Sequence, residues 1–156
     1  MYLVTAQEMR EMDRLAIESF GLPGRLLMET AGRGATGFFL EIFPDCHGKR
    51  VGVVAGRGNN GGDGFVMARC LAERGIRVTV FLLANRIDVS GDAAANLKLL
   101  DPLGIPVVEL PDAEAFSNHT TDLRHQGIWI DAILGTGLNA EVKTYFRDTI
   151  TFINAL

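Results

Sequence analysis

Short runs of aliphatic residues alternate along the chain with segments in which apolar residues recur every three or four positions. The runs predict buried strands, and the periodic segments predict amphipathic helices. Strands are predicted at 51–54, 76–83, 107–108 and 128–133, and helices at about 6–20, 23–43, 64–74, 91–100, 111–117 and 145–156. Strands and helices that alternate over short loops indicate a mainly parallel sheet covered on both faces. We therefore expect one α/β domain, a three-layer αβα fold of the Rossmann-like kind.

The first predicted helix begins with a capping-box pattern, because Glu8 follows Thr5 by three residues. Met9 and Met12 have helical spacing and are expected to be core residues rather than cofactor contacts. The charged residues of this helix are expected to form a solvated face. They are Glu8, Arg10, Glu11, Asp13 and Arg14.

Length, composition and charge are those of an ordinary globular protein. The 156 residues suit one domain with a sizeable core, and 47% of them are hydrophobic against 22% charged. A net charge of −4 without a basic cluster argues against binding to nucleic acid or to a membrane surface. The N-terminus shows no secretory signal, and no apolar run reaches transmembrane length. With two cysteines in unrelated contexts, we expect a reduced, cytoplasmic protein.

The most informative stretch is residues 51–68, which read VGVVAGRGNNGGDGFVMA. Five glycines occur among the nine residues 56–64, between a predicted strand and a predicted helix. This order is typical of a phosphate site, in which main-chain N–H groups and the helix dipole meet the anion. Glycine reaches positive φ and lets a ligand approach the backbone. Asn59 and Asn60 tolerate left-handed conformations and carry amides that can bind a ligand or an ion, and Asp63 is expected to cap the helix.

The same stretch contains Gly56-x-Gly58-x-x-Gly61, so binding of an ordinary dinucleotide must be weighed. The usual companion of this fingerprint is an acid at the end of the next strand, where it holds a ribose hydroxyl. Here that strand ends LLANR, without an acid, and only Arg86 is available to meet a 2′-phosphate. An NADP-dependent oxidoreductase is therefore disfavoured. A glycine-rich turn without any ligand is the other alternative.

A second informative stretch ends the fourth predicted strand, at 129–139, which reads WIDAILGTGLN. Asp131 interrupts an apolar strand, and an unpaired buried carboxylate is strongly destabilising. Ligands of open parallel sheets bind beyond the carboxyl ends of the strands, where the strand order reverses. The first and fourth strands flank that point in the common order, so Asp131 and residues 56–64 should meet there. The alternative is that Asp131 only caps the following turn.

Three motifs together carry a resemblance to a known family: LMETAG at 27–32, GRGNNGGDGFVMAR at 56–69 and DAILGTGL at 131–138. They are similar to the N-terminal domain of the YjeF type, the NAD(P)H-hydrate epimerases, and the similarity covers residues 1–156. The resemblance implies interconversion of the R and S forms of NADHX and NADPHX, nicotinamide cofactors hydrated at C6, as metabolite repair. It also implies a bound potassium ion, a homodimer, and fusion to or cooperation with an ADP-dependent NAD(P)H-hydrate dehydratase.

Carried over by motif, the resemblance assigns the substrate to two segments. These are Asn59, Asn60, Gly61, Gly62 and Asp63 in the first, and Gly135, Thr136, Gly137, Leu138, Asn139, Ala140 and Glu141 in the second. Asn60 and Asp131 are implied as potassium ligands, and a hard cation prefers such amide and carboxylate oxygens. Inversion at a carbon that bears a hydroxyl needs proton transfer, either to expel and re-add water or to open and reclose the ring. We expect Asp131 to be the catalytic acid or base.

Members of the family continue into a strand with an Asp-x-Pro-Ser-Gly motif, which supplies a substrate-binding acid and a further potassium ligand. That motif does not occur in residues 1–156, so the domain is expected to be C-terminally incomplete. Two other functions stay in view, namely a non-enzymatic scaffold or protein-binding domain of the same family and the NADP-dependent oxidoreductase. The scaffold is disfavoured because such domains usually have eroded site residues, whereas Asp131 and the whole NNGGDG string are present.

Overall fold

The computed structural model describes residues 3–136, 141–142 and 144–156. Within these residues the fold is built on a parallel four-stranded sheet with the strand order β3-β2-β1-β4. The strands are β1 (Arg50–Ala55), β2 (Arg77–Leu82), β3 (Val107–Glu109) and β4 (Ile128–Ala132). The strand order reverses between β1 and β4, which are the two strands that the sequence predicts to flank the binding crevice.

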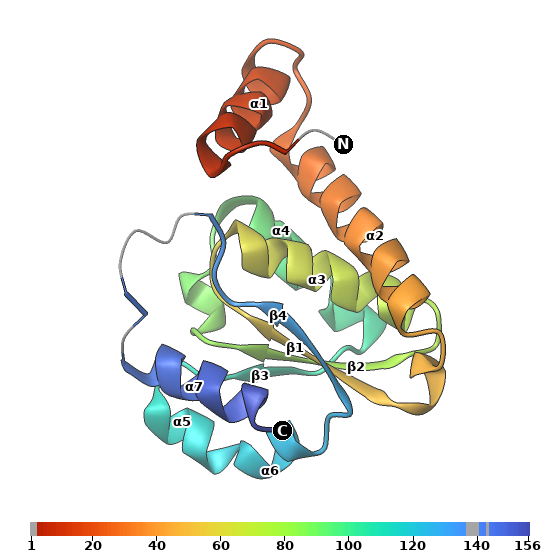
Figure 1. The fold of residues 1–156 in the computed structure, drawn as a ribbon, viewed down its shortest axis with the longest axis vertical. Helices are drawn as coiled ribbons and strands as arrows, with labels where there is room; N and C mark the ends of the chain where they lie inside the picture. The colour runs from red at the N-terminus through yellow and green to blue at the C-terminus, as the bar shows by residue number, and fades with distance from the viewer. Residues whose placement is uncertain (1–2, 137–140, 143) are drawn as a thin grey trace.

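Helices cover both faces of this sheet (Figure 1). On one face lie α3 (Asn59–Ala72) and α4 (Gly91–Lys98), with α2 (Gly24–Ile42) packed against α3. On the other face lie α5 (Ala113–Asn118), α6 (Thr120–Arg124) and α7 (Thr144–Asn154). α1 (Ala6–Glu18) stands at the N-terminal end of α2, and single 3-10 turns lie at η1 (Cys46–Gly48), η2 (Arg86–Asp88) and η3 (Asp101–Leu103). The predicted three-layer αβα fold is confirmed.

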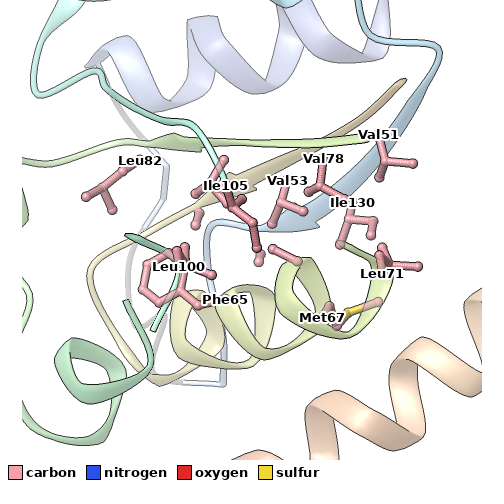
Figure 2. Close-up of a cluster of buried hydrophobic side chains, with 14 of the residues drawn as sticks. Val51, Val53, Phe65, Met67, Leu71, Val78, Leu82, Leu100, Ile105 and Ile130 are labelled. Atoms are coloured by element: carbon pink, nitrogen blue, oxygen red, sulfur yellow. The ribbon is translucent and has the colours of Figure 1, made fainter. Parts of the chain in front are cut away.

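The core has two layers, one on each face of the sheet. Val51 and Val53 of β1 point toward α3 and pack in the same cluster as Phe65 (Figure 2). Val54 points to the opposite face and packs in the cluster that contains Leu123 of α6. A parallel strand that is covered on both faces needs apolar residues in succession. This is why β1 appears in the sequence as an uninterrupted apolar run.

α3 begins earlier than the sequence predicts. A loop is expected over 56–64, but the helix begins at Asn59 and includes most of that segment. Glycine destabilises a helix by about 1 kcal/mol per residue relative to alanine, and tertiary packing overrides that preference here. Gly61 is buried, and a Cβ on it would lie 1.9 Å from the carbonyl oxygen of Gly56. Asp63 lies inside the helix and does not cap it, so that prediction is wrong.

α1 differs from its prediction in where its apolar residues lie. The predicted capping box of Thr5 and Glu8 is present. No residue of α1 is buried, however, and Met9 and Met12 are 43% and 54% exposed, so the prediction that they are core residues is wrong for a single copy of the chain. Helical spacing alone does not distinguish an apolar face that the same chain covers from one that stays open.

Smaller features of the sequence also have clear outcomes. Both cysteines, Cys46 and Cys70, are free and buried. None of the described helices is long and apolar enough to cross a membrane. α6 is a five-residue helix of mostly polar sequence, and apolar periodicity does not predict it.

Candidate functional site

The two glycine-containing segments leave the sheet from neighbouring strands. Val54 of β1 pairs with Asp131 of β4. Shortly after these residues, each strand ends at the carboxyl edge of the sheet. The chain after β1 enters α3, whose N-cap is Gly58 and which has no side-chain cap. The first N–H groups of α3 therefore lack helical acceptors and lie at the positive end of the helix dipole. This arrangement suits an anionic group such as a phosphate.

The glycines of 56–64 serve close packing rather than unusual backbone conformation. None of them has a positive φ, contrary to the role that the sequence predicts for them. A Cβ on Gly56 would lie 2.2 Å from the carbonyl oxygen of Ile133, so β1 and the end of β4 approach each other through this position. Among these glycines, Gly58 is the one whose Cβ position has, apart from its chain neighbours, no other described residue within 4 Å. It is therefore the position at which a ligand can approach the backbone.

Asn60 connects the two segments. Its Nδ2 donates a hydrogen bond of 3.1 Å to the carbonyl oxygen of Leu134, just after β4. A Cβ on Gly135 would lie 3.2 Å from the Cβ of Asn60, so the next residue of the second segment also lies against this side chain. The start of α3 and the chain that leaves β4 thus meet at the carboxyl edge of the sheet.

Another side of the α3 N-terminus borders a cavity of about 200 Å³. Polar side chains from three helices line it together with apolar residues of α1 and α2: they are Asp13, Asn59, Asp63 and Asp92. Asp63 is half-buried, and this burial, followed by the negative charge of Asp13, raises the pKa of the Asp63 carboxyl to about 6. A carboxyl group with that pKa both gives and takes a proton near neutral pH.

Asp131 is an exposed residue at the carboxyl edge. Ile130 and Ala132 pack in the cluster that faces α3, so the alternation of the strand turns Asp131 to the other face, with Trp129. Its Oδ1 accepts a 2.9 Å hydrogen bond from the N–H of Ile133. Asp131 therefore caps the turn that follows β4, as the alternative interpretation of the sequence predicts. Its Oδ2 has no hydrogen bond with the described residues. One carboxylate oxygen is thus used by the fold and the other is open to a ligand.

The oxygen atoms that could hold a cation come from two side chains. In the described part of the chain, no group of three or more His, Cys, Asp or Glu side chains is arranged to bind a metal ion. The Nδ2 group of Asn60 donates a hydrogen to Leu134, so Oδ1 of Asn60 remains available as an acceptor. Oδ2 of Asp131 is available in the same way. Amide and carboxylate oxygens match a hard cation and not a metal that prefers thiolate or imidazole. The donor chemistry therefore fits the implied potassium ion.

The second predicted substrate segment is described only at its ends. Its exposed residues there are Gly135, Thr136 and Glu141. Four further residues of the prediction lie outside the described residues: Gly137, Leu138, Asn139 and Ala140. Because the segment follows Leu134, it starts beside the N-terminus of α3.

Two side chains of α1 reach the site, although the sequence predicts that they lie on a solvated face. A guanidinium N–H of Arg10 donates a 3.0 Å hydrogen bond to the carbonyl oxygen of Thr136. Asp13, three residues later, lines the cavity with Asp63. The three-residue spacing is a signal that both side chains lie on one side of the helix. Spacing does not reveal which neighbour that side meets.

Arg86 has partners that make it a poor ligand for a 2′-phosphate. Its guanidinium forms a 3.0 Å ion pair with Asp101 and lies 3.8 Å from the carboxylate of Glu109. Its main-chain N–H donates a 2.7 Å hydrogen bond to Glu109 as well. These contacts hold the turn after β2, and they further disfavour the NADP-dependent oxidoreductase.

Comparison with known proteins gives one family. The protein family described as YjeF-related protein N-terminus matches residues 24–156 of this chain. The chain is 39% identical to the bifunctional NAD(P)H-hydrate repair enzyme Nnr of Salinibacter ruber, over 97% of this chain and 29% of that protein. It is 37% identical to the NAD(P)H-hydrate epimerase of Rhodopirellula baltica, over 97% of this chain and 59% of that protein. The identity to the NAD(P)H-hydrate epimerase of Elusimicrobium minutum is 36%, over 99% and 70%.

A solved structure agrees with this match. The crystal structure of yeast ynu0 (YNL200c) superposes with a TM-score of 0.82 at 26% identity, over 98% of this chain and 65% of that one. The chain spans 29% of the length of the Salinibacter ruber protein and 59% of that of the Rhodopirellula baltica protein. It therefore corresponds to a part of these relatives.

Proposed function

The chain belongs to the family of the YjeF-related protein N-terminus, and on this basis we propose that it is an NAD(P)H-hydrate epimerase. The reaction is the interconversion of the R and S forms of NADHX and NADPHX, which repairs hydrated nicotinamide cofactors. The observation that carries the proposal is the family match over 24–156. The identities of 36% and 37% to two proteins named NAD(P)H-hydrate epimerase, over nearly the whole chain, support it.

In this proposal the pyrophosphate of the substrate binds at the start of α3. Among the described residues, the open space at Gly58 and the first N–H groups of α3, which have no acceptor within the helix, support that assignment. Gly61 and Gly62 are buried. Because glycine has no side chain, they contribute to the site through main-chain atoms. The hydrated ring lies toward the end of β4, where Asp131 and the second substrate segment leave the sheet.

Epimerisation requires a proton to move in each direction. The hydroxyl leaves C6 as water and water returns on the other face, or the ring opens and recloses. We assign the proton transfer to Oδ2 of Asp131, because Oδ1 is held by the Ile133 N–H. In the first route Oδ2 gives its proton to the departing hydroxyl, the ring nitrogen stabilises the cation, and the returning water gives a proton back to Oδ2. The fixed carboxylate keeps its orientation through both halves of the reaction.

We propose that a potassium ion binds to Oδ1 of Asn60 and to the Asp131 carboxylate, through a lone pair that neither the Ile133 N–H nor the transferred proton uses, and supplies positive charge beside the reacting group. The amide and carboxylate donors support this choice. The measurement is the melting temperature in KCl and in NaCl at equal ionic strength. A higher melting temperature in KCl is expected, and equal values would contradict a specific potassium site.

We also propose that the protein is a homodimer and works with an ADP-dependent NAD(P)H-hydrate dehydratase. Large apolar side chains of α1, α2 and the chain around them are open to solvent, and a second copy would cover them. The most exposed are Leu3, Met12, Phe20, Phe38 and Ile42, at 85%, 54%, 79%, 65% and 53%. Light scattering is expected to give the mass of two chains. The bifunctional repair enzymes among the relatives support the dehydratase partner.

A coupled assay tests the epimerase itself. A mixture of the two NADHX epimers is incubated with an S-specific dehydratase, which by itself stops when the S form is consumed. With this protein added, the reaction is expected to run to completion. If the R form persists, the protein is not an epimerase. Absence of any binding to NADP would then favour the scaffold, and hydride transfer to a substrate would favour the oxidoreductase.

A further inference from the structure

One hydrogen bond connects α1 to the second substrate segment, which is distant in the sequence. Arg10 donates a hydrogen bond to the main-chain carbonyl of Thr136, 126 positions further along the chain. No residue of α1 is buried, so packing alone does not explain why this helix lies where it does. The acceptor is a main-chain atom, and the contact therefore fixes the path of the backbone and not a particular side chain.

The side of α1 that carries Arg10 also borders the first substrate segment. Asp13 and Ile17, three and seven residues after Arg10, line the cavity that Asn59 and Asp63 line from α3. Residues at these spacings lie on one side of a helix. This side of α1 thus faces both predicted substrate segments.

Within the described residues, the chain that leaves β4 has two side-chain anchors, one from each neighbouring helix. Asn60 of α3 holds the carbonyl of Leu134 at 3.1 Å, and Arg10 of α1 holds the carbonyl of Thr136 at 3.0 Å. The two carbonyls belong to residues that flank Gly135, a residue with no side chain to hold it in place. Two anchors around a glycine restrict a backbone that would otherwise have wide conformational freedom.

We propose that Arg10 is a positioning residue for the substrate, which holds the start of the second substrate segment in its binding conformation. The inference rests on the proposed function, since it gives α1 a part in the epimerase site. Without Arg10, the anchor from Asn60 is the one that remains among the described residues of this part of the chain. Substrate binding then has to order the segment, so the change falls on KM rather than on kcat.

The kinetic test compares Arg10→Ala with Arg14→Ala in the full-length protein. Arg14 lies on the same helix, makes the same change in charge and pairs only with Glu11 and Glu18 of α1 among the described residues, so it is a matched control. Loss of one charge-assisted hydrogen bond is expected to raise KM about five- to tenfold in Arg10→Ala, with kcat within about twofold. Arg10→Lys retains a donor and is expected to give an intermediate KM. Equal KM values for the two alanine variants would overturn the proposal.

A second measurement does not depend on activity. Hydrogen exchange at the amides of residues 134–136 is expected to become faster in Arg10→Ala and to stay unchanged in Arg14→Ala. If wild-type protein shows no epimerisation, the proposed function fails, but this measurement still reports whether Arg10 holds the segment. Unchanged exchange in Arg10→Ala, or the same acceleration in both variants, would overturn the role of Arg10.

Discussion

The side chain of Asn60, in the first substrate segment, donates an Nδ2 hydrogen to the carbonyl oxygen of Leu134, 3.1 Å away and directly before the second segment. This bond connects the start of α3 to the chain that leaves β4. The same side chain leaves Oδ1 as the amide oxygen that we assign to potassium. Asn60 therefore has a structural partner and a proposed ligand on the two ends of one amide group.

Replacing Asn60 by alanine removes both functions of the amide. The free energy of unfolding is expected to fall by about 1 kcal/mol, because the hydrogen bond from Asn60 to the Leu134 carbonyl is lost. The difference in melting temperature between KCl and NaCl is expected to disappear. Urea unfolding of Asn60→Ala and of Asn59→Ala, whose side chain is exposed, measures the first effect. Equal losses in the two variants would show that the Leu134 hydrogen bond contributes nothing.

The close approach of Gly61 to Gly56 predicts a strong effect of a single methyl group. A Cβ on Gly61 would lie 1.9 Å from a main-chain oxygen, so Gly61→Ala is expected to destabilise the fold by about 3 kcal/mol. Apart from its neighbours in the helix, Gly37 in α2 has no other residue of the described chain within 4 Å of its Cβ position. Gly37→Ala is therefore expected to stabilise the protein by about 0.5–1 kcal/mol through helix propensity. Both values follow from urea unfolding, and a mild effect at Gly61 would contradict the packing described for β1 and α3.

Asp63 predicts a dependence of stability on pH. Burial and the charge of Asp13 raise the pKa of its carboxyl to about 6 in the folded state, above the ordinary value of 3.8. Between these two values the folded state binds more protons than the unfolded state, so this group's contribution to stability falls as the pH rises from about 4 to about 6.

Asp63→Asn removes that ionisation. The variant is expected to be more stable than wild type above pH 6, by about 1 kcal/mol after allowance for the solvent-exposed half of the group, and equally stable below pH 4. Asp13→Asn is expected to change the pH dependence in the same direction but less, because burial is the larger cause. Thermal unfolding from pH 4 to pH 8 gives the comparison. A gain that is the same at every pH would exclude ionisation as its cause.

Asp131 allows a nearly isosteric test of the chemistry. Asparagine keeps an oxygen that accepts from the Ile133 N–H, so Asp131→Asn is expected to retain the turn after β4. It removes the titratable oxygen, and epimerisation is expected to fall about 100-fold or more in the coupled assay. Asp122→Asn, a change of the same kind at an exposed residue of α6, is expected to keep wild-type activity. Undiminished epimerisation in Asp131→Asn would remove this residue from the mechanism.

Local patterns along the chain were sufficient for the strands, for most helices and for the two segments that meet at the sheet edge. Apolar runs and clustered glycines are properties of neighbouring residues, so the sequence carries them directly. The start of α3 was predicted too late, because the local pattern there does not contain the deciding contact. Helix propensity is local, whereas the need for glycine at Gly61 comes from Gly56, which lies across a turn.

The sequence by itself determined the order of elements, the layered fold and the family of this protein. Only the tertiary structure decided that Met9 and Met12 lie open to solvent, that the Asp131 carboxylate caps its own turn, and that Arg10 reaches Thr136. The spacing of residues specifies which side of an element they occupy. What that side meets depends on segments far away in the chain, and these become neighbours only when the sheet and its helices assemble.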